Sequence, residues 1–352
     1  MLAVNVKREA LRGNIEKEEW TMVTIYDVAK EAGVSHTTVS RVLNRKKSGI
    51  SISEETRKKV REAAARLNYT PSRAARNLST GQTNCFCFLL CDRLFTNLYY
   101  YSLLKVVEEE LSKRGMGLIF AIYKEDEELP PMLKERAVDG ILVTGRVTQK
   151  IVSAIKGINI PFIVLGTMAD KEYEVNQVQS DVKDDVMTMY SYLLGYGHQE
   201  IAYLTDYKEE LLIQKVVDGC KLAYEQYNLK PRLHLLKTNV RDPYTVIDEI
   251  LSEHKEITAL IIQSHFVSAF SNFVRERGLD IPDKVSVIMC NDESLDNAQR
   301  TYFNHLPGGS KEMGEEGVKS LIELSRGRMG KMNITIPKQI SQGHTVKKIL
   351  VK

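Results

Sequence analysis

Polar side chains of the kinds that contact nucleic acid gather within one short stretch of this sequence. They lie at helical spacing, opposite the apolar positions of the same stretch, and they are Ser35, His36, Thr37, Ser40 and Arg41. Short hydroxyl groups, an imidazole and a guanidinium can reach base edges and phosphates in the major groove of DNA. The stretch therefore predicts a DNA-reading surface, provided that a helix holds these side chains on one face.

Three short helices are expected to build this surface. Thr24 followed by Asp27 is typical of a helix start, and Gly33 allows the left-handed turn that ends the first helix. Ser35 can cap the next helix, in which Val39 would fill the space between helices. The pattern indicates a helix-turn-helix that turns the polar residues outward.

The basic charge of the chain is concentrated in the same region. The 352 residues carry a net charge of +3, but residues 22–84 hold twelve basic and five acidic side chains, a net charge of +7. Residues 1–21 are neutral, and residues 85–352 carry −4. A basic block joined to an acidic body suggests that one end of the chain meets a polyanion, although a solvated helix surface would give the same count.

Two stretches resemble, almost residue for residue, the headpiece and hinge of the lactose/galactose repressor (LacI/GalR) family of bacterial transcription regulators. They are TIYDVAKEAGVSHTTVSRVLN at 24–44 and SISEETRKKVREAAARLNYTPSRAARNLSTGQTN at 51–84. Weaker similarities continue through the body, among them LLGYGHQEIAYL at 193–204 and GLDIP at 278–282. The loop after Asn44 is a few residues longer than is usual in the family, so its phosphate contacts cannot be transferred by position.

The resemblance implies roles for single residues at the DNA. The matching positions are His36, Thr37 and Arg41 for base reading, and Thr24, Ser35 and Asn44 for the DNA backbone. Leu78 matches the leucine that the family inserts between base steps in the minor groove, and Arg73 and Arg76 would meet phosphates. In the alternative interpretation, Leu78 packs against the body and both arginines are solvated.

Beyond the hinge, short apolar runs alternate with amphipathic helices. Runs at 85–92, 117–123 and 139–145 are each followed by a helical pattern, and a second such series follows a helix at 184–196. Strands separated by single helices are typical of parallel βαβ units, so two series predict two doubly wound lobes. The family resemblance implies that this body is similar to periplasmic binding proteins.

The expected fold is thus a small all-α headpiece with a hinge helix, followed by two doubly wound parallel α/β lobes. The expected division is a tail at 1–21, disordered or outside the true start, a helix-turn-helix domain at 22–69, a hinge at 70–84, and a two-lobed effector-binding and dimerisation domain at 85–352.

The resemblance also implies a small-molecule cleft between the lobes, but the residues that usually grip a sugar differ here. Val216 stands where an arginine is usual, Asn291 where an aspartate is usual, and Gln263 and Ser264 where an asparagine-aspartate pair is usual. Each lost hydrogen bond would cost roughly 1–3 kcal/mol, which argues against a standard sugar grip. The polar residues that could still hold a ligand are Asp92, Tyr99, Tyr100, Asp181, Gln263, His265, Asn291 and Asp292.

Three interpretations of the cleft stay open at the level of sequence. It binds a ligand other than a standard sugar, it responds to a protein partner, or it has no ligand and the body serves only for dimerisation. Tyr99 and Tyr100 would also fit core packing at a helix start, and His265 would also fit a surface position.

Other classes of function have little support in the sequence. No GxSxG, P-loop or HExxH motif is present, the five cysteines form no CxxC pair, and no apolar run approaches the length of a membrane span. We therefore expect no enzyme activity, cofactor, metal or membrane partner, and buried apolar roles for the cysteines. We expect a cytoplasmic, nucleoid-associated regulator.

The expected function is repression by a homodimer on a palindromic DNA operator, with a tetramer also open, under the control of a small-molecule effector. The alternatives are the same DNA-binding regulator without such an effector and, more remotely, a solute-binding protein that does not act on DNA.

Overall fold

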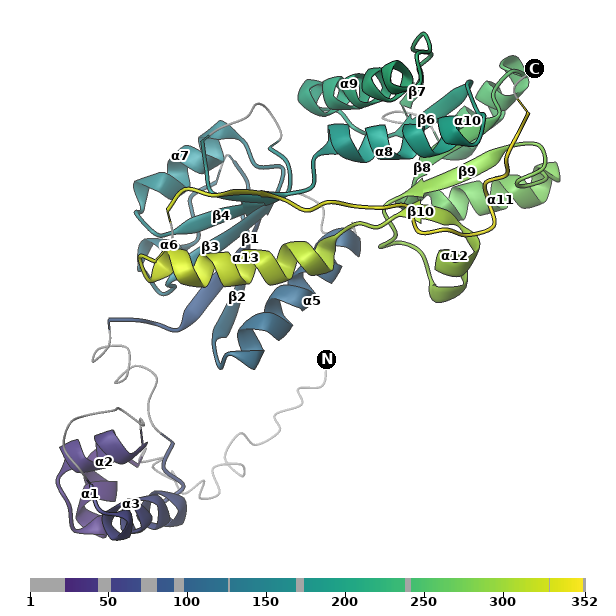
Figure 1. The fold of residues 1–352 in the computed structure, drawn as a ribbon. Coiled ribbons are helices and arrows are strands. Elements are labelled where there is room, and N and C mark those ends of the chain that lie inside the picture. The colour runs from purple at the N-terminus through teal and green to yellow at the C-terminus, as the bar shows by residue number, and fades with distance from the viewer. Residues whose placement is uncertain are drawn as a thin grey trace, which may run out of the picture. The chain divides into compact units, whose positions relative to one another are not determined.

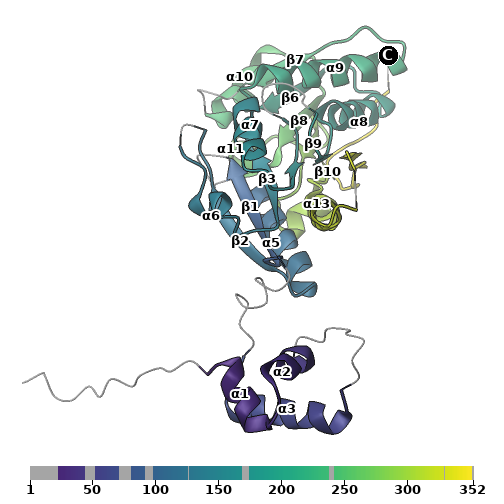
Figure 2. The same cartoon turned by 90° about the vertical axis from the view of Figure 1, so that its left-hand side faces the viewer.

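A computed structural model describes residues 23–43, 52–70, 81–91, 98–125, 127–168, 174–237, 242–328 and 330–350. The chain divides into two compact units, Met1–Gln82 and Thr83–Lys352. Figures 1 and 2 show the fold of each unit in two views. The expected tail at 1–21, and residues 71–80 of the expected hinge, lie outside the described residues.

The first unit is built from three helices, α1 (Ile25–Ala32), α2 (His36–Leu43) and α3 (Glu54–Arg66). The backbone N–H and the hydroxyl of Thr24 both donate to the Asp27 carboxylate, at 2.8 and 2.7 Å, and so hold the start of α1. Gly33 ends α1 in the left-handed conformation, with a φ of 64°. Fully buried side chains join the three helices, and they are Val28 from α1, Val39 from α2, and Val60 and Ala63 from α3.

The second unit contains two lobes, each built on a parallel sheet. The strand order of the first lobe is β11-β5-β4-β3-β1-β2. Its strands are β1 (Cys85–Cys91), β2 (Gly117–Ile122), β3 (Gly140–Gly145), β4 (Phe162–Leu165), β5 (Gln177–Gln179) and β11 (Asn333–Thr335). One face is covered by α5 (Leu98–Lys113) and α13 (Ser310–Ser325), and the other by α6 (Pro131–Lys134) and α7 (Gln149–Gly157).

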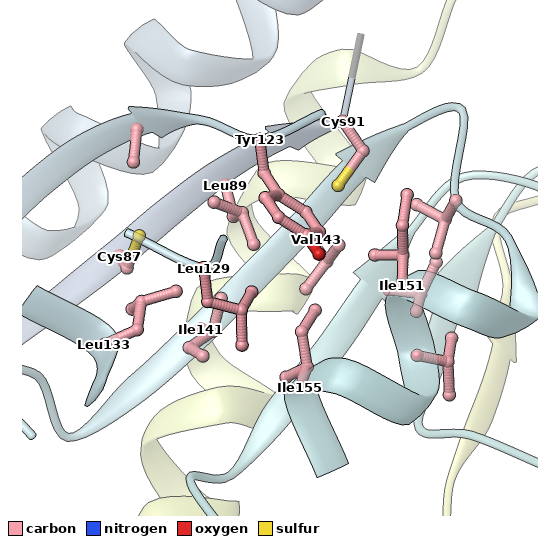
Figure 3. Close-up of a cluster of buried hydrophobic side chains, with 14 of the residues drawn as sticks. Cys87, Leu89, Cys91, Tyr123, Leu129, Leu133, Ile141, Val143, Ile151 and Ile155 are labelled. Atoms are coloured by element: carbon pink, nitrogen blue, oxygen red, sulfur yellow. The ribbon is translucent and has the colours of Figure 1, made fainter. Parts of the chain in front are cut away.

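Strand β1 contributes to the cores on both faces of this sheet, because successive side chains of a strand point to opposite sides. Phe86 and Phe88 pack with α5 and α13, whereas Cys87 and Leu89 pack with α6 and α7 (Figure 3). Burial raises the pKa of the Cys87 thiol to about 12. This cysteine therefore acts as a small apolar core residue.

The second lobe has the strand order β10-β9-β8-β6-β7. Its strands are β6 (Ile201–Thr205), β7 (His234–Lys237), β8 (Ala259–Gln263), β9 (Ser286–Cys290) and β10 (Asn304–Leu306). One face is covered by α8 (Val182–Gly195) and α9 (Glu210–Gln226), and the other by α10 (Pro243–Glu253) and α11 (Val267–Arg277). The 3-10 turn η1 (Ser264–Phe266) follows β8, and the short helix α12 (Asn297–Tyr302) precedes β10.

The chain passes between the two lobes three times. β5 leads into α8, β10 leads back into α13, and β11 leads into a last extended segment whose Ser341 pairs with His305 of β10. Figure 1 shows this last passage in yellow. The two parallel lobes confirm the predicted fold class, but two consecutive series of strands do not predict that α13 and β11 return to the first lobe.

Candidate nucleic-acid interface and inter-lobe cleft

Helix α2 turns its apolar side chains inward and its polar side chains outward. Val39 is buried against the other helices, whereas His36 and Thr37 are exposed and Ser40 and Arg41 are partly exposed. Side chains four residues apart on a helix are neighbours, and His36 with Ser40 and Thr37 with Arg41 form two such pairs side by side. The structure thus brings these four polar side chains onto one outward surface, which we call the α2 face.

Ser35 serves as the start of this helix. Its hydroxyl accepts the Thr38 backbone N–H at 3.2 Å and lies 2.8 Å from the Thr37 hydroxyl and 2.9 Å from the Thr38 hydroxyl. A serine in this position satisfies a backbone donor that would otherwise have no partner inside the helix. Ser35 therefore fixes where the α2 face begins.

Tyr26 of α1 extends the α2 face, and it is a residue that sequence reasoning missed. Its side chain is 65% exposed, and its ring lies 5.1 Å from the His36 ring, centroid to centroid, with 43° between the planes. A large aromatic ring on the solvent side of a helix, next to the buried Val28, is a signal that the sequence already contained. The exposed ring pair joins α1 to the first residue of α2.

The charges of α3 are largely neutralised within the unit. Lys59 and Arg57 lie 2.8 and 3.4 Å from Glu55 and Glu54, and Arg66 lies 3.2 Å from Glu31 of α1. Within the described residues of this unit, Lys30 of α1, Arg41 of α2 and Arg61 of α3 have no carboxylate within 4.0 Å. Each of the three helices therefore carries one uncompensated positive charge, and that of α2 is Arg41.

Five predicted site residues, Asn44, Arg73, Arg76, Leu78 and Asp92, lie outside the described residues.

In the second lobe, the loops that follow neighbouring strands form a hydrogen-bonded set at the carboxyl ends of the sheet. The Gln263 side-chain oxygen accepts the Asp206 backbone N–H at 3.1 Å. The Asn291 side-chain oxygen accepts both the Ser264 hydroxyl, at 3.0 Å, and the Glu293 backbone N–H, at 2.9 Å. Carboxyl ends of strands are where open α/β sheets bind ligands, and here these groups already bind one another.

His265 faces Asp206 in the same set. Its Nε2 lies 3.4 Å from the Asp206 carboxylate. Burial opposes ionisation of Asp206, but the hydrogen bond and the charge of His265 outweigh it and hold the pKa of that carboxyl below its usual range. His265 thus contacts the loop after β6 and is not an isolated surface histidine.

A buried cation, Lys215, lies one residue before Val216, the position where an arginine is usual in the family. Val216 is fully buried in the core beneath α8 and α9. Lys215 instead reaches the crossing between the lobes, where its Nζ lies 3.4 Å from the Asp181 carboxylate and its side chain is only 10% exposed. A lysine next to a valine that the apolar pattern sends inward could have been found from the sequence.

The Tyr99 side chain packs within the first lobe. Its hydroxyl donates to the Met313 sulfur at 3.0 Å, and its ring meets the Tyr100 ring edge-on at 5.6 Å. Burial raises the pKa of Tyr99, and the nearby Tyr100, Glu293 and Asp185 raise it further. Tyr99 is therefore bonded within the first lobe, to Met313 of α13.

Asp292 connects its own loop to two other segments of the second unit. Its carboxylate accepts the Gly308 backbone N–H at 2.9 Å and lies 3.4 Å from the Arg300 guanidinium.

Two ion pairs join the lobes directly. Arg146, after β3, lies 3.0 Å from Glu209, which precedes α9. Lys338, in the last passage between the lobes, lies 2.9 Å from Asp185 of α8, and the two side chains are 8% and 15% exposed. These pairs hold the two lobes around the loops described above.

The described residues offer no group of three histidine, cysteine, aspartate or glutamate side chains that could hold a metal ion. Among the helices that the structure describes, none combines the length and apolar character needed to cross a membrane.

Two family models match the chain. One, described as bacterial regulatory proteins of the lacI family, matches residues 24–72, and the other, described as periplasmic binding proteins and sugar binding domain of the LacI family, matches residues 83–321.

Similar proteins cover nearly the whole chain. The transcriptional repressor PurR of Vibrio campbellii is 28% identical over 346 residues, which are 93% of this chain and 100% of that protein. Catabolite control protein A of Priestia megaterium is 27% identical over 314 residues, 86% of this chain and 92% of that protein. The solved structure of the lac repressor dimer bound to operator and an anti-inducer has a similar fold, with a TM-score of 0.76, 21% identity, and coverage of 92% of this chain and 99% of that one.

Proposed function

The chain belongs to the LacI family of bacterial regulatory proteins, and on this premise we propose that it represses transcription as a homodimer on a palindromic operator, under the control of an effector in the inter-lobe cleft. It is a DNA-binding transcriptional regulator, as its relatives are. The observation that carries the proposal is the α2 face. Its polar side chains are exposed or partly exposed, and no carboxylate among the described residues lies within 4.0 Å of its Arg41 guanidinium.

We assign the DNA contacts to the helix-turn-helix domain at 22–69 and the hinge at 70–84, which overlap the matched segment 24–72. His36, Thr37 and Arg41 read bases, with Ser40 on the same face. The groups assigned to the DNA backbone and to the minor groove are Thr24, Ser35, Asn44, Arg73, Arg76 and Leu78.

The second unit, 85–352, is the proposed dimerisation body. On the first lobe, Tyr101, Phe120 and Ile122 are exposed by 57%, 40% and 45%, and the last two lie on the edge strand β2. On the second lobe, an apolar pocket of about 320 Å³ lies against α11 and α12, lined by Phe270, Val274 and Tyr302 among others. Exposed apolar surface of this kind supports pairing with a second copy, and a two-fold dimer fits a palindromic site. A tetramer would need a further interface.

The cleft is the proposed effector site. Its candidate contacts are Tyr99, Tyr100, Asp181, Gln263, His265, Asn291, Asp292 and Asp92, to which Lys215 is added. Because the cation here is a lysine paired with Asp181, and because Gln263 and Asn291 are bonded within the protein, a ligand of another class than a simple sugar fits best. The matched periplasmic-binding domain favours such an effector over control by a protein partner or a body without ligand.

A regulator of this kind works at the nucleoid, in the cytoplasm, and we infer neither catalysis nor a cofactor. Selection from random duplexes, followed by binding at increasing salt, tests the DNA proposal, because phosphate contacts make affinity fall steeply with salt. A selection without an enriched palindrome would contradict it. Thermal shift of the full chain against a metabolite collection tests the cleft, with Lys215→Gln as the variant expected to lose the shift.

A further inference from the structure

His36 is the single histidine of the first unit. The seven histidines of the chain are at positions 36, 198, 234, 254, 265, 305 and 344. His36 opens α2, its side chain is exposed, and the Tyr26 ring lies against it at 5.1 Å. Histidine is the side chain whose charge ordinarily changes between pH 5 and 8. Proton uptake by a side chain on the α2 face in this range therefore points to one residue.

The two forms of the ring read different bases. A neutral imidazole has one donor and one acceptor, whereas an imidazolium has two donors and no acceptor. Guanine presents two acceptors in the major groove, while adenine presents an acceptor beside a donor. The charged ring is therefore suited to guanine, and loss of its proton removes a donor from that contact.

In the part of the first unit that the structure describes, no carboxylate lies within 4.0 Å of the His36 ring nitrogens. The titratable or charged groups on the helices packed around it are, on α1, Tyr26, Asp27, Lys30 and Glu31, on α2, Arg41, and on α3, Glu54, Glu55, Arg57, Lys58, Lys59, Arg61, Glu62 and Arg66. Asp27 accepts hydrogen bonds from Thr24 and keeps its charge, whereas Glu31 is paired with Arg66 and Glu55 with Lys59.

Bound DNA would bring negative charge to the α2 face, because its phosphates favour a positive group there. We propose that His36 takes up a proton when the protein binds DNA and reads guanine as an imidazolium, with Tyr26 as the residue that positions the ring. This inference rests on the proposed function. It makes operator affinity increase as pH falls.

Two features suit Tyr26 to positioning the His36 ring. Contact with its ring restricts the orientations of His36, and the face of an aromatic ring attracts a cation. Because the Tyr26 side chain is 65% exposed, it can be replaced without opening the core of the unit.

The test uses the full chain and duplexes selected from random sequence at about pH 6 and about pH 8. One proton taken up changes Kd by at most about tenfold per pH unit, so we expect Kd for the duplex selected at low pH to rise roughly threefold to tenfold per unit near neutrality. His36→Gln should flatten this slope. His254→Gln changes a partly exposed histidine of the second unit that is bonded to Glu256, and this control variant should keep the slope.

The change of Kd with pH also tests whether Tyr26 positions His36. Tyr26→Phe, which keeps the ring, should preserve the pH dependence, and Tyr26→Leu should reduce it. A selected duplex bound with the same pH slope by His36→Gln and by the parent would overturn the inference and leave the proposed function standing. If no duplex is enriched at either pH, both are overturned.

Discussion

Lys338 and Asp185 form a buried ion pair at the place where the chain passes for the last time between its two lobes, with 2.9 Å between Nζ and the carboxylate. Asp185 also accepts the Ser180 hydroxyl at 2.8 Å, at the first passage. One carboxylate thus connects two of the segments that join the lobes.

Removing one partner of this pair should destabilise the protein strongly, because it leaves a buried charge without compensation. We expect Lys338→Met to lower the free energy of unfolding by about 3 kcal/mol, as measured by urea denaturation. The double variant with Asp185→Leu should lose less than Lys338→Met alone. An equal or larger loss in the double variant would show that the uncompensated charge of Asp185 is not the cause of the destabilisation.

Close packing of α8 against α9 depends on Gly219. A Cβ there would lie 2.3 Å from the Lys183 carbonyl oxygen and 2.9 Å from the Val186 Cβ, so Gly219→Ala should cost roughly 1–3 kcal/mol or more in thermal or urea unfolding. Gly157→Ala is the matched control, because nothing lies within 4 Å of its Cβ position. This control should be neutral or stabilising by up to about 1 kcal/mol.

The stability of the second unit should fall as pH falls below neutrality. Burial lowers the pKa of His198, whose Nε2 donates to the Lys347 carbonyl at 3.0 Å and whose Nδ1 lies 2.9 Å from the Thr258 hydroxyl. The unfolded chain, with a histidine pKa of about 6.5, then binds more protons than the folded one. The contribution of neutral His198 to the free energy of unfolding is therefore present above about pH 6.5. It is lost as the pH falls through the pKa of His198 in the folded state.

Urea unfolding at a series of pH values measures this loss. His198→Gln should be less stable at neutral pH but should show a flatter profile between about pH 7 and pH 5. Parallel profiles for parent and variant would assign the acid sensitivity to other groups.

Arg41→Ala should weaken binding to a selected operator by about 1–3 kcal/mol and relax the preference at one base position, if the guanidinium contacts a base. Arg61→Ala is a control of equal charge on α3, where the side chain is exposed and away from the α2 face. Fluorescence anisotropy measures binding to the operator and to a duplex changed at that position. The comparison distinguishes a base contact from a phosphate contact. Equal losses on both duplexes would make Arg41 a phosphate contact.

Leu78→Ala should reduce affinity for the operator while leaving affinity for unrelated duplexes nearly unchanged, because a leucine in the proposed role would act only where the duplex is bent. Binding to both kinds of duplex by the same anisotropy measurement provides the comparison. Loss on both would argue against insertion.

The sequence alone was sufficient to predict the three helices of the first unit and the fold class of the second unit. The contacts that form α1 and its turn join residues a few positions apart, as Thr24 and Asp27 do, and the three helices meet through side chains at regular helical spacing. Strands such as β1 are apolar on both sides and form continuous apolar runs in the sequence. Such a strand can therefore be predicted before the strands that pair with it are known. Local patterns of this kind can be read along the chain.

Only the tertiary structure decided which residues meet across long separations. It brought α13 and β11 back to the first lobe, placed Lys215 instead of Val216 beside Asp181, and set Tyr26 against His36. The physical reason is that a local pattern specifies which face of an element is apolar, but not which other element covers it. That choice depends on the summed packing and pairing of residues that lie far apart in the sequence.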